Sequence, residues 1–237
     1  MIRYDYVEID GIEYAVLDKE QQKELMKTKF DLLLRKSNIP DFYKTEVDFD
    51  DYIGEYSRPY VEEIQKIAKN IYNEKLKDVS LYLYGTLNST QKTACQCNFG
   101  KECIRQGLRV QYMNFGVFVS YLLKNQGYNV DEDAKKEINI LKNSDIILLD
   151  DCFDSKKNIT WGKNDLIVSE IDSFFRVALG NHKRFCLTSN FPIESVKESY
   201  GVSFFELLDR NFKTYQFLDS VKTVRKSRFE NLELENI

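Results

Sequence analysis

Asp145-Ile146-Ile147-Leu148-Leu149-Asp150-Asp151 is the stretch that decides the fold. Its run of aliphatic residues predicts a short buried strand over residues 145–149, because such runs are typical of strands covered on both faces. Two carboxylates follow, at the edge of a sheet where ligands usually bind. We predict that Asp150 holds a magnesium ion, directly or through water, and that Asp151 orients and deprotonates an attacking water. A helix N-cap or a solvated turn after a core strand is the alternative.

Other short apolar runs flank this one, with helix-like stretches between them. They predict strands over residues 79–84, 109–114, 184–188 and 214–218. Strands that alternate with helices in one chain favour a mostly parallel sheet with crossover helices. We therefore expect an α/β fold with a parallel five-stranded sheet flanked by helices.

The loop after the first of these strands has the layout of a phosphate-binding loop. The strand ends in Gly85, and a polar loop leads to Lys92-Thr93 and a helix-like stretch. In such loops backbone N–H groups hold phosphates, lysine neutralises them and threonine binds magnesium. The candidate nucleotide-binding residues are Gly85, Asn88, Ser89, Thr90, Gln91, Lys92 and Thr93, with Thr93 also a candidate metal ligand.

This loop departs from the standard G-x-x-x-x-G-K-S/T pattern. Gly85 and Lys92 are one residue further apart than the pattern requires, and Gln91 replaces the second glycine. A side chain at Gln91 restricts positive φ and narrows the approach of a phosphate. A plain strand, turn and helix would give the same local pattern.

Two further polar segments follow apolar elements. Thr188-Ser189-Asn190 ends a strand, and Asn190 offers a donor and an acceptor for a γ-phosphate and its attacking water, although turn chemistry before Pro192 is the alternative. A predicted helix ends at Asp209-Arg210, and Arg210 is a candidate arginine finger for a neighbouring subunit's nucleotide. The alternative there is a surface pair between Asp209 and Arg210.

The first 40 residues are predicted as a small α+β segment before a main domain of residues 41–237. Residues 4–16 alternate around Asp10-Gly11, which suits a short hairpin. Residues 19–36 repeat apolar side chains near helical spacing and predict an amphipathic helix that stops before Ile39-Pro40. A second helix is predicted over residues 59–75, with Pro59 in its first turn.

Composition limits the classes of function. The chain has 237 residues, of which 43% are hydrophobic and 30% charged, as in one soluble globular domain with a small appendage. Its net charge of −4 means that any contact with DNA needs a local basic patch. No apolar run is long enough for a membrane span, and the N-terminus lacks the pattern of a signal peptide, so we expect a cytoplasmic protein.

The cysteines and the single histidine narrow the chemistry further. Five cysteines without an export signal are expected to be reduced thiols. Cys95, Cys97 and Cys103 raise zinc as an alternative, but helix positions two apart point in different directions and no fourth ligand is near. His182 is the only histidine, and on this ground we expect neither a histidine-based metal site nor a Ser-His or Cys-His nucleophilic pair.

Taken in order, these segments resemble the ATPase domain of the DnaC/DnaI helicase loaders and the related IstB transposition helpers. The family's phosphate loop falls on residues 85–93, its acidic strand end on Asp150 and Asp151, its sensor on residues 188–190 and its arginine finger on Arg210. Asn38-Ile39-Pro40-Asp41-Phe42-Tyr43 is similar to the family's Ile-Pro linker, so the resemblance covers residues 37–230. It implies an AAA+ ATPase domain.

The resemblance also implies ligands and partners. They are ATP and Mg²⁺, a homo-oligomer when nucleotide is bound, the hexameric replicative helicase and single-stranded DNA, in a bacterial or phage-infected cell. The family's helicase contact falls on the N-terminal segment, which here has no cysteines and so no zinc-binding domain of the kind that some loaders carry. The altered phosphate loop leaves a non-hydrolysing adaptor as an alternative, and the Lys-Thr layout alone also fits a small-molecule kinase.

A basic stretch follows the last predicted strand. It comprises Lys222, Arg225, Lys226 and Arg228. Arg225 is a candidate second nucleotide sensor or DNA-backbone contact. A solvated helix face is the alternative.

Overall fold

A five-stranded parallel sheet forms the centre of the molecule. The computed structural model describes residues 4–9, 12–52, 54–76, 78–86, 91–125, 131–153 and 164–218. The strand order is β4-β5-β6-β3-β7. These strands are β3 (Ser80–Tyr84), β4 (Val110–Asn114), β5 (Ile146–Cys152), β6 (Arg184–Ser189) and β7 (Phe212–Gln216). The predicted α/β fold is confirmed, so the carboxyl ends of all five strands lie at one edge.

Two of the strands differ from their predicted bounds by two residues or more. Strand β7 begins at Phe212 instead of residue 214, directly after a helix. Strand β5 continues through Asp150 and Asp151 to Cys152, and its register against β6 shifts between Leu149 and Cys152. Because of this irregularity the strand includes the two carboxylates, which the apolar pattern had placed after the end of the strand.

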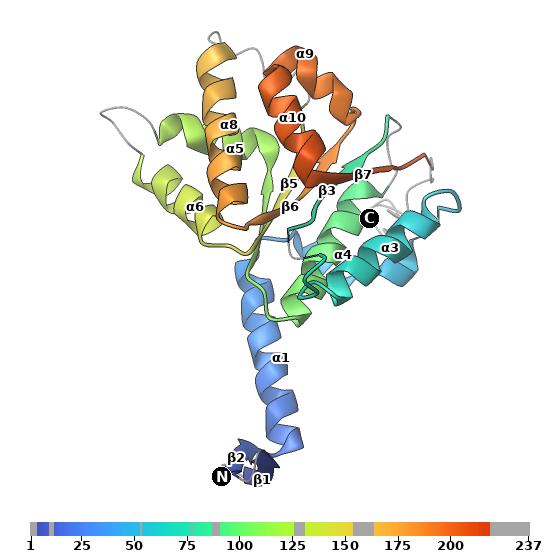
Figure 1. Cartoon of the computed structure of the whole chain (residues 1–237), viewed down its shortest axis with the longest axis vertical. Helices are drawn as coiled ribbons and strands as arrows, with labels where there is room; N and C mark the ends of the chain where they lie inside the picture. The colour runs from blue at the N-terminus through green and yellow to red at the C-terminus, as the bar shows by residue number, and fades with distance from the viewer. Residues whose placement is uncertain are drawn as a thin grey trace, which may run out of the picture.

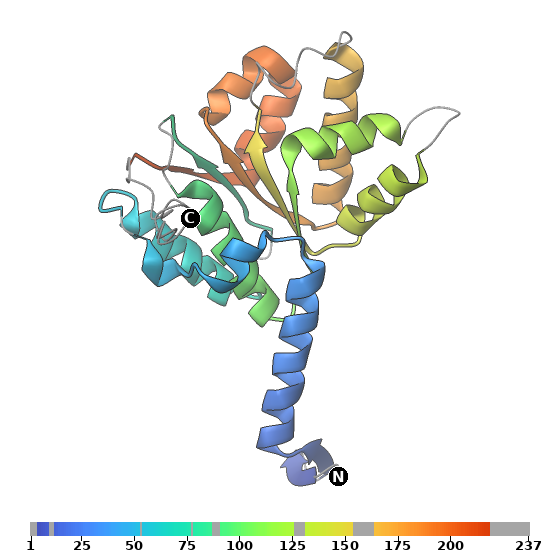
Figure 2. The ribbon, with the colours of Figure 1, turned by 180° about the vertical axis from the view of Figure 1, so that it is seen from behind.

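Helices cover both faces of the sheet (Figures 1 and 2). One face carries α5 (Phe115–Lys124), α6 (Glu132–Lys142), α8 (Asn164–Gly180), η2 (Ile193–Ser195), α9 (Val196–Tyr200) and α10 (Val202–Asn211). The other face carries α2 (Asp41–Thr45), η1 (Phe49–Asp51), α3 (Arg58–Lys69) and α4 (Lys92–Arg105). The first face has an aromatic core in which Phe175 stacks on Phe185, with ring centroids 4.5 Å apart.

Helix α4 lies closely against the sheet. A Cβ atom at Gly100 would approach Leu148 Cδ1 to 2.6 Å, so glycine permits this packing. The amide of Gln96 is buried below the helix and donates to the carbonyls of Leu149 and Cys186, at 2.9 and 2.6 Å. These bonds fix α4 to two neighbouring strands, and its first turn is thereby held at the edge where those strands end.

All five cysteines are buried and form no disulfide. Within the described part of the chain, His, Cys, Asp and Glu side chains form no group of three that could hold a metal ion. Among the helices of that part, none is both long and apolar enough to cross a membrane.

The N-terminal hairpin and helix are present as predicted in outline. Strands β1 (Tyr4–Ile9) and β2 (Ile12–Leu17) are antiparallel, and α1 (Lys19–Lys36) follows. Helix α1 extends away from the body of the molecule (Figure 1). Its apolar side chains do not form one covered stripe, because Leu25 and Met26 are 59% and 70% exposed and no residue of the helix is fully buried. Only Phe30, Leu33 and Leu34 pack on the core, and all three lie in its C-terminal half.

The chain between α1 and α2 belongs to the core of the main domain. Ile39 is 1% exposed within the cluster of apolar residues beneath α4. The backbone N–H of Tyr112, on edge strand β4, donates to the carbonyl of Ser37 at 2.7 Å. The end of α1 is therefore joined to the edge of the sheet.

The predicted helix over residues 59–75 is wrong at its end, since α3 stops at Lys69. The side chain of Asn70 donates to the Lys66 carbonyl, and Asn73 accepts from the N–H of Lys75. Asparagine side chains that bond to nearby backbone groups compete with the helix and favour turns. The apolar pattern continues past this point, to a buried Ile71, but the helix does not.

Candidate nucleotide site

The start of α4 meets the acidic end of β5 at the carboxyl edge of the sheet. The hydroxyl of Thr93 donates to Asp150 Oδ1 at 2.9 Å. Lys92 Nζ donates to the Gly85 carbonyl at 3.0 Å and to Asn190 Oδ1 at 3.2 Å. Segments that are far apart in the sequence are thus joined by hydrogen bonds in one place.

Asp150 accepts hydrogen bonds from three hydroxyl groups. Thr93 and Thr188 both donate to Oδ1, and Tyr112 donates to Oδ2 at 2.8 Å. Thr188 also accepts from the N–H of Asp151 at 2.9 Å, so it links the two acidic residues. Burial, followed by the charge of Asp150, raises the pKa of Tyr112, which keeps its hydroxyl protonated and donating.

Tyr112 and Thr188 were not among the predicted site residues. Tyr112 lies on β4, whose sequence carries no acidic residue, and its role depends on β4 lying beside β5. Strand order is not visible in the local pattern. Thr188 belongs to the predicted sensor segment, but Asn190 was the residue chosen there.

Asp151 and Asn190 form the outer part of the site. Asn190 Nδ2 donates to Asp151 Oδ1 at 3.2 Å, so its amide lies between Lys92 and Asp151. Asp151 has a left-handed backbone, with φ of 58°. A left-handed conformation is uncommon outside glycine and is typical of functional turns.

Lys92 is partly buried, and the negative charges of Asp150 and Asp151 act on its ammonium group. Burial lowers its pKa, and the charges of Asp150 and Asp151 act in the opposite direction. Removal from water therefore outweighs the attraction of the two carboxylates. A lysine held in this way gains from an additional anion near Nζ.

The loop before α4 contains two constrained positions. A Cβ atom at Gly85 would collide with the Phe217 carbonyl oxygen, so packing against the end of β7 requires glycine here. Gln91 was expected to resist a positive φ, yet its φ is 59°. The backbone therefore takes the conformation that glycine favours, at a cost of about 1 kcal/mol for a residue with a side chain. The side chain of Gln91 does not cap α4.

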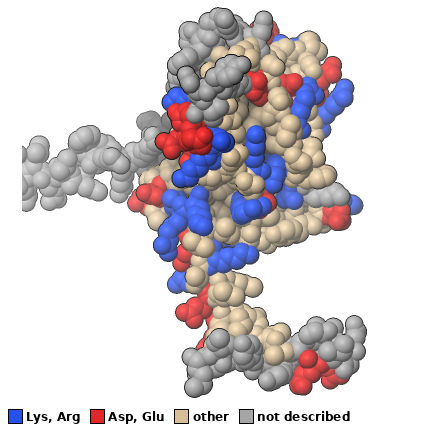
Figure 3. Space-filling model, turned by 90° about the vertical axis from the view of Figure 1, so that its left-hand side faces the viewer, with Lys and Arg blue, Asp and Glu red and all other residues tan. Residues whose placement is uncertain are grey.

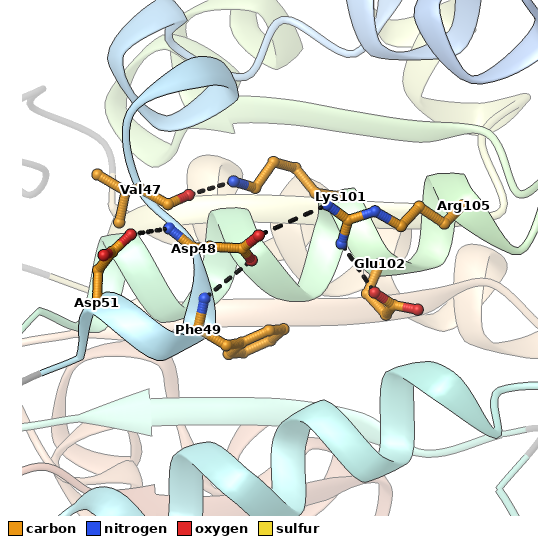
Figure 4. Close-up of polar contacts among 7 residues, drawn as sticks. All are labelled: Val47, Asp48, Phe49, Asp51, Lys101, Glu102 and Arg105. Carbon is orange, nitrogen blue, oxygen red and sulfur yellow. Dashed lines mark hydrogen bonds and ion pairs between the residues drawn. The ribbon is translucent and has the colours of Figure 1, made fainter. Parts of the chain in front are cut away.

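The segment before α3 lies along α4, and its polar contacts are with the C-terminal half of that helix (Figure 4). Lys101 donates to the Val47 carbonyl, and Arg105 pairs with Glu102 at 2.9 Å and with Asp48 at 3.7 Å. A cavity of about 10 Å³ remains between this segment and α4, lined in part by Phe49, Gln91 and Asn98. That volume holds about one water molecule, so residues 47–52 pack closely on the first half of α4.

Several predicted site residues are not brought to this place. Arg210 lies in the last turn of α10, two residues before β7 begins, and therefore at the opposite edge of the sheet from Lys92. Its side chain is 76% exposed and pairs with Glu206 at 3.4 Å, not with Asp209. Asn88, Ser89, Thr90 and Arg225 lie outside the described residues.

The residues that are brought together fit ATP and Mg²⁺. Lys92 and the first turn of α4 offer positive charge and N–H groups to phosphates, as helix N-termini do. The Thr93 hydroxyl donates a hydrogen bond to Asp150, so the lone pairs of its oxygen stay free for a hard cation. The carboxylate oxygens of Asp150 are nearby. A bound magnesium would supply charge neutralisation to the phosphates.

Comparison with known proteins gives the fold a name. The structure is similar to the DnaC helicase loader (TM-score 0.60, 16% identity, covering 75% of this chain and 99% of that one). It is also similar to DnaI (0.59, 13%, 76% and 94%) and to AMPPCP-bound DnaA from Aquifex aeolicus (0.55, 20%, 76% and 51%). The fold is that of an AAA+ domain.

The AAA+ likeness covers the other proteins to different extents. The chain spans nearly all of the matched DnaC and DnaI chains, but only about half of DnaA and of a DNA replication initiation factor. No protein-family model matches the sequence, and no curated protein matches it. The predicted resemblance to DnaC/DnaI-type AAA+ proteins is thus confirmed in the fold.

Proposed function

We propose that this chain is an AAA+ ATPase that acts as a helicase loader in DNA replication. It binds Mg²⁺ and ATP at the carboxyl edge of the sheet, binds the hexameric replicative helicase, and assists its placement on single-stranded DNA. The observation that carries this proposal is the hydrogen-bonded set of Lys92, Thr93, Asp150, Asp151 and Asn190. The fold shared with the DnaC helicase loader and DnaI supports it.

Each residue of the set has a proposed role. Lys92 and the start of α4 hold the phosphates, while Thr93 and Asp150 hold the metal. Asp151 takes the proton of the attacking water, and Asn190 orients that water from its position 3.2 Å from Asp151 Oδ1. Arg210 lies too far along the sheet to serve its own site, so it acts on the nucleotide of the next subunit in a homo-oligomer.

The test of nucleotide binding is a titration of the full chain with fluorescent ATP, with and without Mg²⁺. Lys92→Ala should weaken binding at least tenfold, since one charged hydrogen bond to phosphate contributes about 1.5–3 kcal/mol. Lys142→Ala, at an exposed position on α6, is the matched control. Equal affinity in wild type and Lys92→Ala would remove the ATPase assignment.

The test of loading uses the replicative helicase of the same host. Complex size should increase when the chain and the helicase are mixed with ATP, and helicase activity on single-stranded DNA should rise. If no complex forms with or without ATP, the loader function is wrong even where nucleotide binding is intact.

A second candidate is a non-hydrolysing adaptor that binds helicase or DNA. The small cavity beside Gln91 and the engagement of Lys92 by Gly85 and Asn190 favour it, since both describe a closed site. Asp151→Asn separates the two candidates, because an adaptor should load helicase normally with this substitution. A loader that depends on hydrolysis should lose its loading activity.

A further inference from the structure

A groove lies on the opposite edge of the sheet from the nucleotide site. It has a volume of about 720 Å³ and runs between α6, the start of β4 and the end of α1. Aliphatic side chains of Leu33, Val110 and Ile140 line it, and lysines and amides surround them. None of the nucleotide-site residues borders this groove, so it is a separate feature.

One atom of a buried amide in the groove has no hydrogen-bond partner in the described part of the chain. Gln111 is 2% exposed, and its Nε2 has no hydrogen-bond acceptor among the described residues. A buried donor left unpaired costs about 1–3 kcal/mol, and native proteins rarely retain one without a reason. Gln111 lines the groove, so an acceptor that enters the groove can satisfy it.

The groove also contains an open sheet edge. Strand β4 is the outermost strand, and the Tyr112 N–H points away from β5 to reach Ser37. Because backbone groups alternate in direction along a strand, those of Val110 point the same way and bond to no described residue. Asn38, with φ of 56°, turns the chain away after this single bond and leaves the edge open.

The rim of the groove is mainly basic. Figure 3 looks onto this side and shows Lys and Arg side chains gathered over it. Arg109 pairs with Asp145 at 2.9 Å and Lys135 with Glu132 at 3.3 Å, whereas Lys36 and Lys136 form no ion pair with a described residue. Two lysines are therefore available for a negatively charged partner.

We propose that this groove docks an extended, acidic segment of a partner protein, which adds a short strand to the β4 edge. Its backbone pairs with Val110 and offers a carbonyl to Gln111, its aliphatic side chains cover Leu33 and Ile140, and its carboxylates meet Lys36 and Lys136.

A peptide fits this groove better than a nucleic acid strand. Among the residues that the structure describes, no aromatic side chain lines it, so they offer bases no stacking surface. Unpaired strand edges are moreover a common docking site for extended peptides.

The test is fluorescence anisotropy with the full chain and a labelled peptide of alternating Val and Glu. Wild type should bind it saturably at low salt. The double substitution Lys36→Glu/Lys136→Glu should weaken binding about tenfold, because two surface attractions become repulsions. Lys142→Glu, on the same helix but outside the groove, should bind as wild type does.

Gln111→Met separates a docking role from a structural one. It should lower peptide affinity about fivefold through the lost donor, while the thermal midpoint stays the same or rises. A fall in the midpoint with unchanged affinity would contradict the docking role. The same peptide N-methylated at alternate residues, which cannot pair along a strand, should not bind.

Three results would overturn the proposal. They are equal affinity of wild type and the double variant, equal binding of the N-methylated peptide, and tighter binding of an oligothymidylate than of the peptide, in which case the groove serves nucleic acid. Lys92→Ala should bind the peptide normally, so the outcome is independent of the nucleotide site.

Discussion

The hydroxyl of Tyr112 donates to Asp150 Oδ2 across 2.8 Å, while Thr93 and Thr188 both occupy Oδ1. The carboxylate of Asp150, near the end of β5, is thus oriented by the neighbouring strands β4 and β6 as well as by α4. This arrangement leads to the first prediction.

Tyr112→Phe should weaken the binding of Mg²⁺ at the nucleotide site. Nucleotide binding without metal should stay unchanged. A hydrogen bond to a charged group contributes about 1.5–3 kcal/mol, so the Mg²⁺ concentration at half-saturation should rise at least tenfold. A Mg²⁺ titration of fluorescent ATP binding measures this, with Tyr72→Phe as the control, since that exposed tyrosine bonds to the Gln106 carbonyl beyond the C-terminal end of α4. An unchanged midpoint would show that Tyr112 does not position Asp150.

Lys92→Met should stabilise the protein at neutral pH while it abolishes nucleotide binding. The folded state lowers the pKa of Lys92 below its ordinary value of 10.5, because burial outweighs the attraction of the carboxylates. The unfolded state therefore binds more protons between the two pKa values, and the charged lysine costs stability below both. The gain in thermal midpoint should be full at pH 7 and should shrink as the pH rises toward 10.5. A loss of stability at pH 7 would contradict this sign.

Gly85→Ala should destabilise the fold by about 1–3 kcal/mol, since the new methyl group meets the Phe217 carbonyl and the end of β7 must shift. Gly180→Ala is the matched control, because nothing lies within 4 Å of a Cβ at that position. Urea unfolding of both variants measures the difference. Equal midpoints would mean that the chain after β7 moves freely.

Gln91→Gly should raise stability slightly or leave it unchanged, and should improve ATP affinity or turnover. Glycine adopts a φ of 59° without the cost of about 1 kcal/mol that a side chain imposes, although it also adds entropy to the unfolded chain. Turnover measured as phosphate release, beside thermal unfolding, checks both parts. Lower turnover would show that the glutamine side chain contributes to the site.

Arg210→Ala should leave stability within about 0.5 kcal/mol, because the exposed pair with Glu206 contributes little. If it is an arginine finger, phosphate release should be lost in Arg210→Ala alone and in Asp151→Asn alone. Mixing the two should restore part of it, since some interfaces then combine an intact Asp151 with an intact Arg210. The absence of any recovery in mixed oligomers would argue against a role between subunits.

The sheet and the acidic pair were predictable because each depends on a short local pattern. Ile146 to Leu149 form an apolar run, and the next two residues fall at the edge that parallel strands share. Tyr112 was not predictable, since its contact depends on which strand lies beside β5. The end of α3 was missed because Asn70 and Asn73 form turns within an apolar pattern that continues past them. The positive φ of Gln91 was not predictable, because residues with a side chain disfavour this conformation and the surrounding fold overrides that preference.

Tyr112 is held at both ends. Its hydroxyl bonds to Asp150, and its backbone N–H bonds to Ser37, where α1 ends. Helix α1 has 18 residues and is therefore about 27 Å long. A tilt of about 5° at the base of α1 would move its far end by about 2 Å. A small shift of Tyr112 beside the Asp150 carboxylate is therefore enlarged along the helix, on which Leu25 and Met26 are exposed.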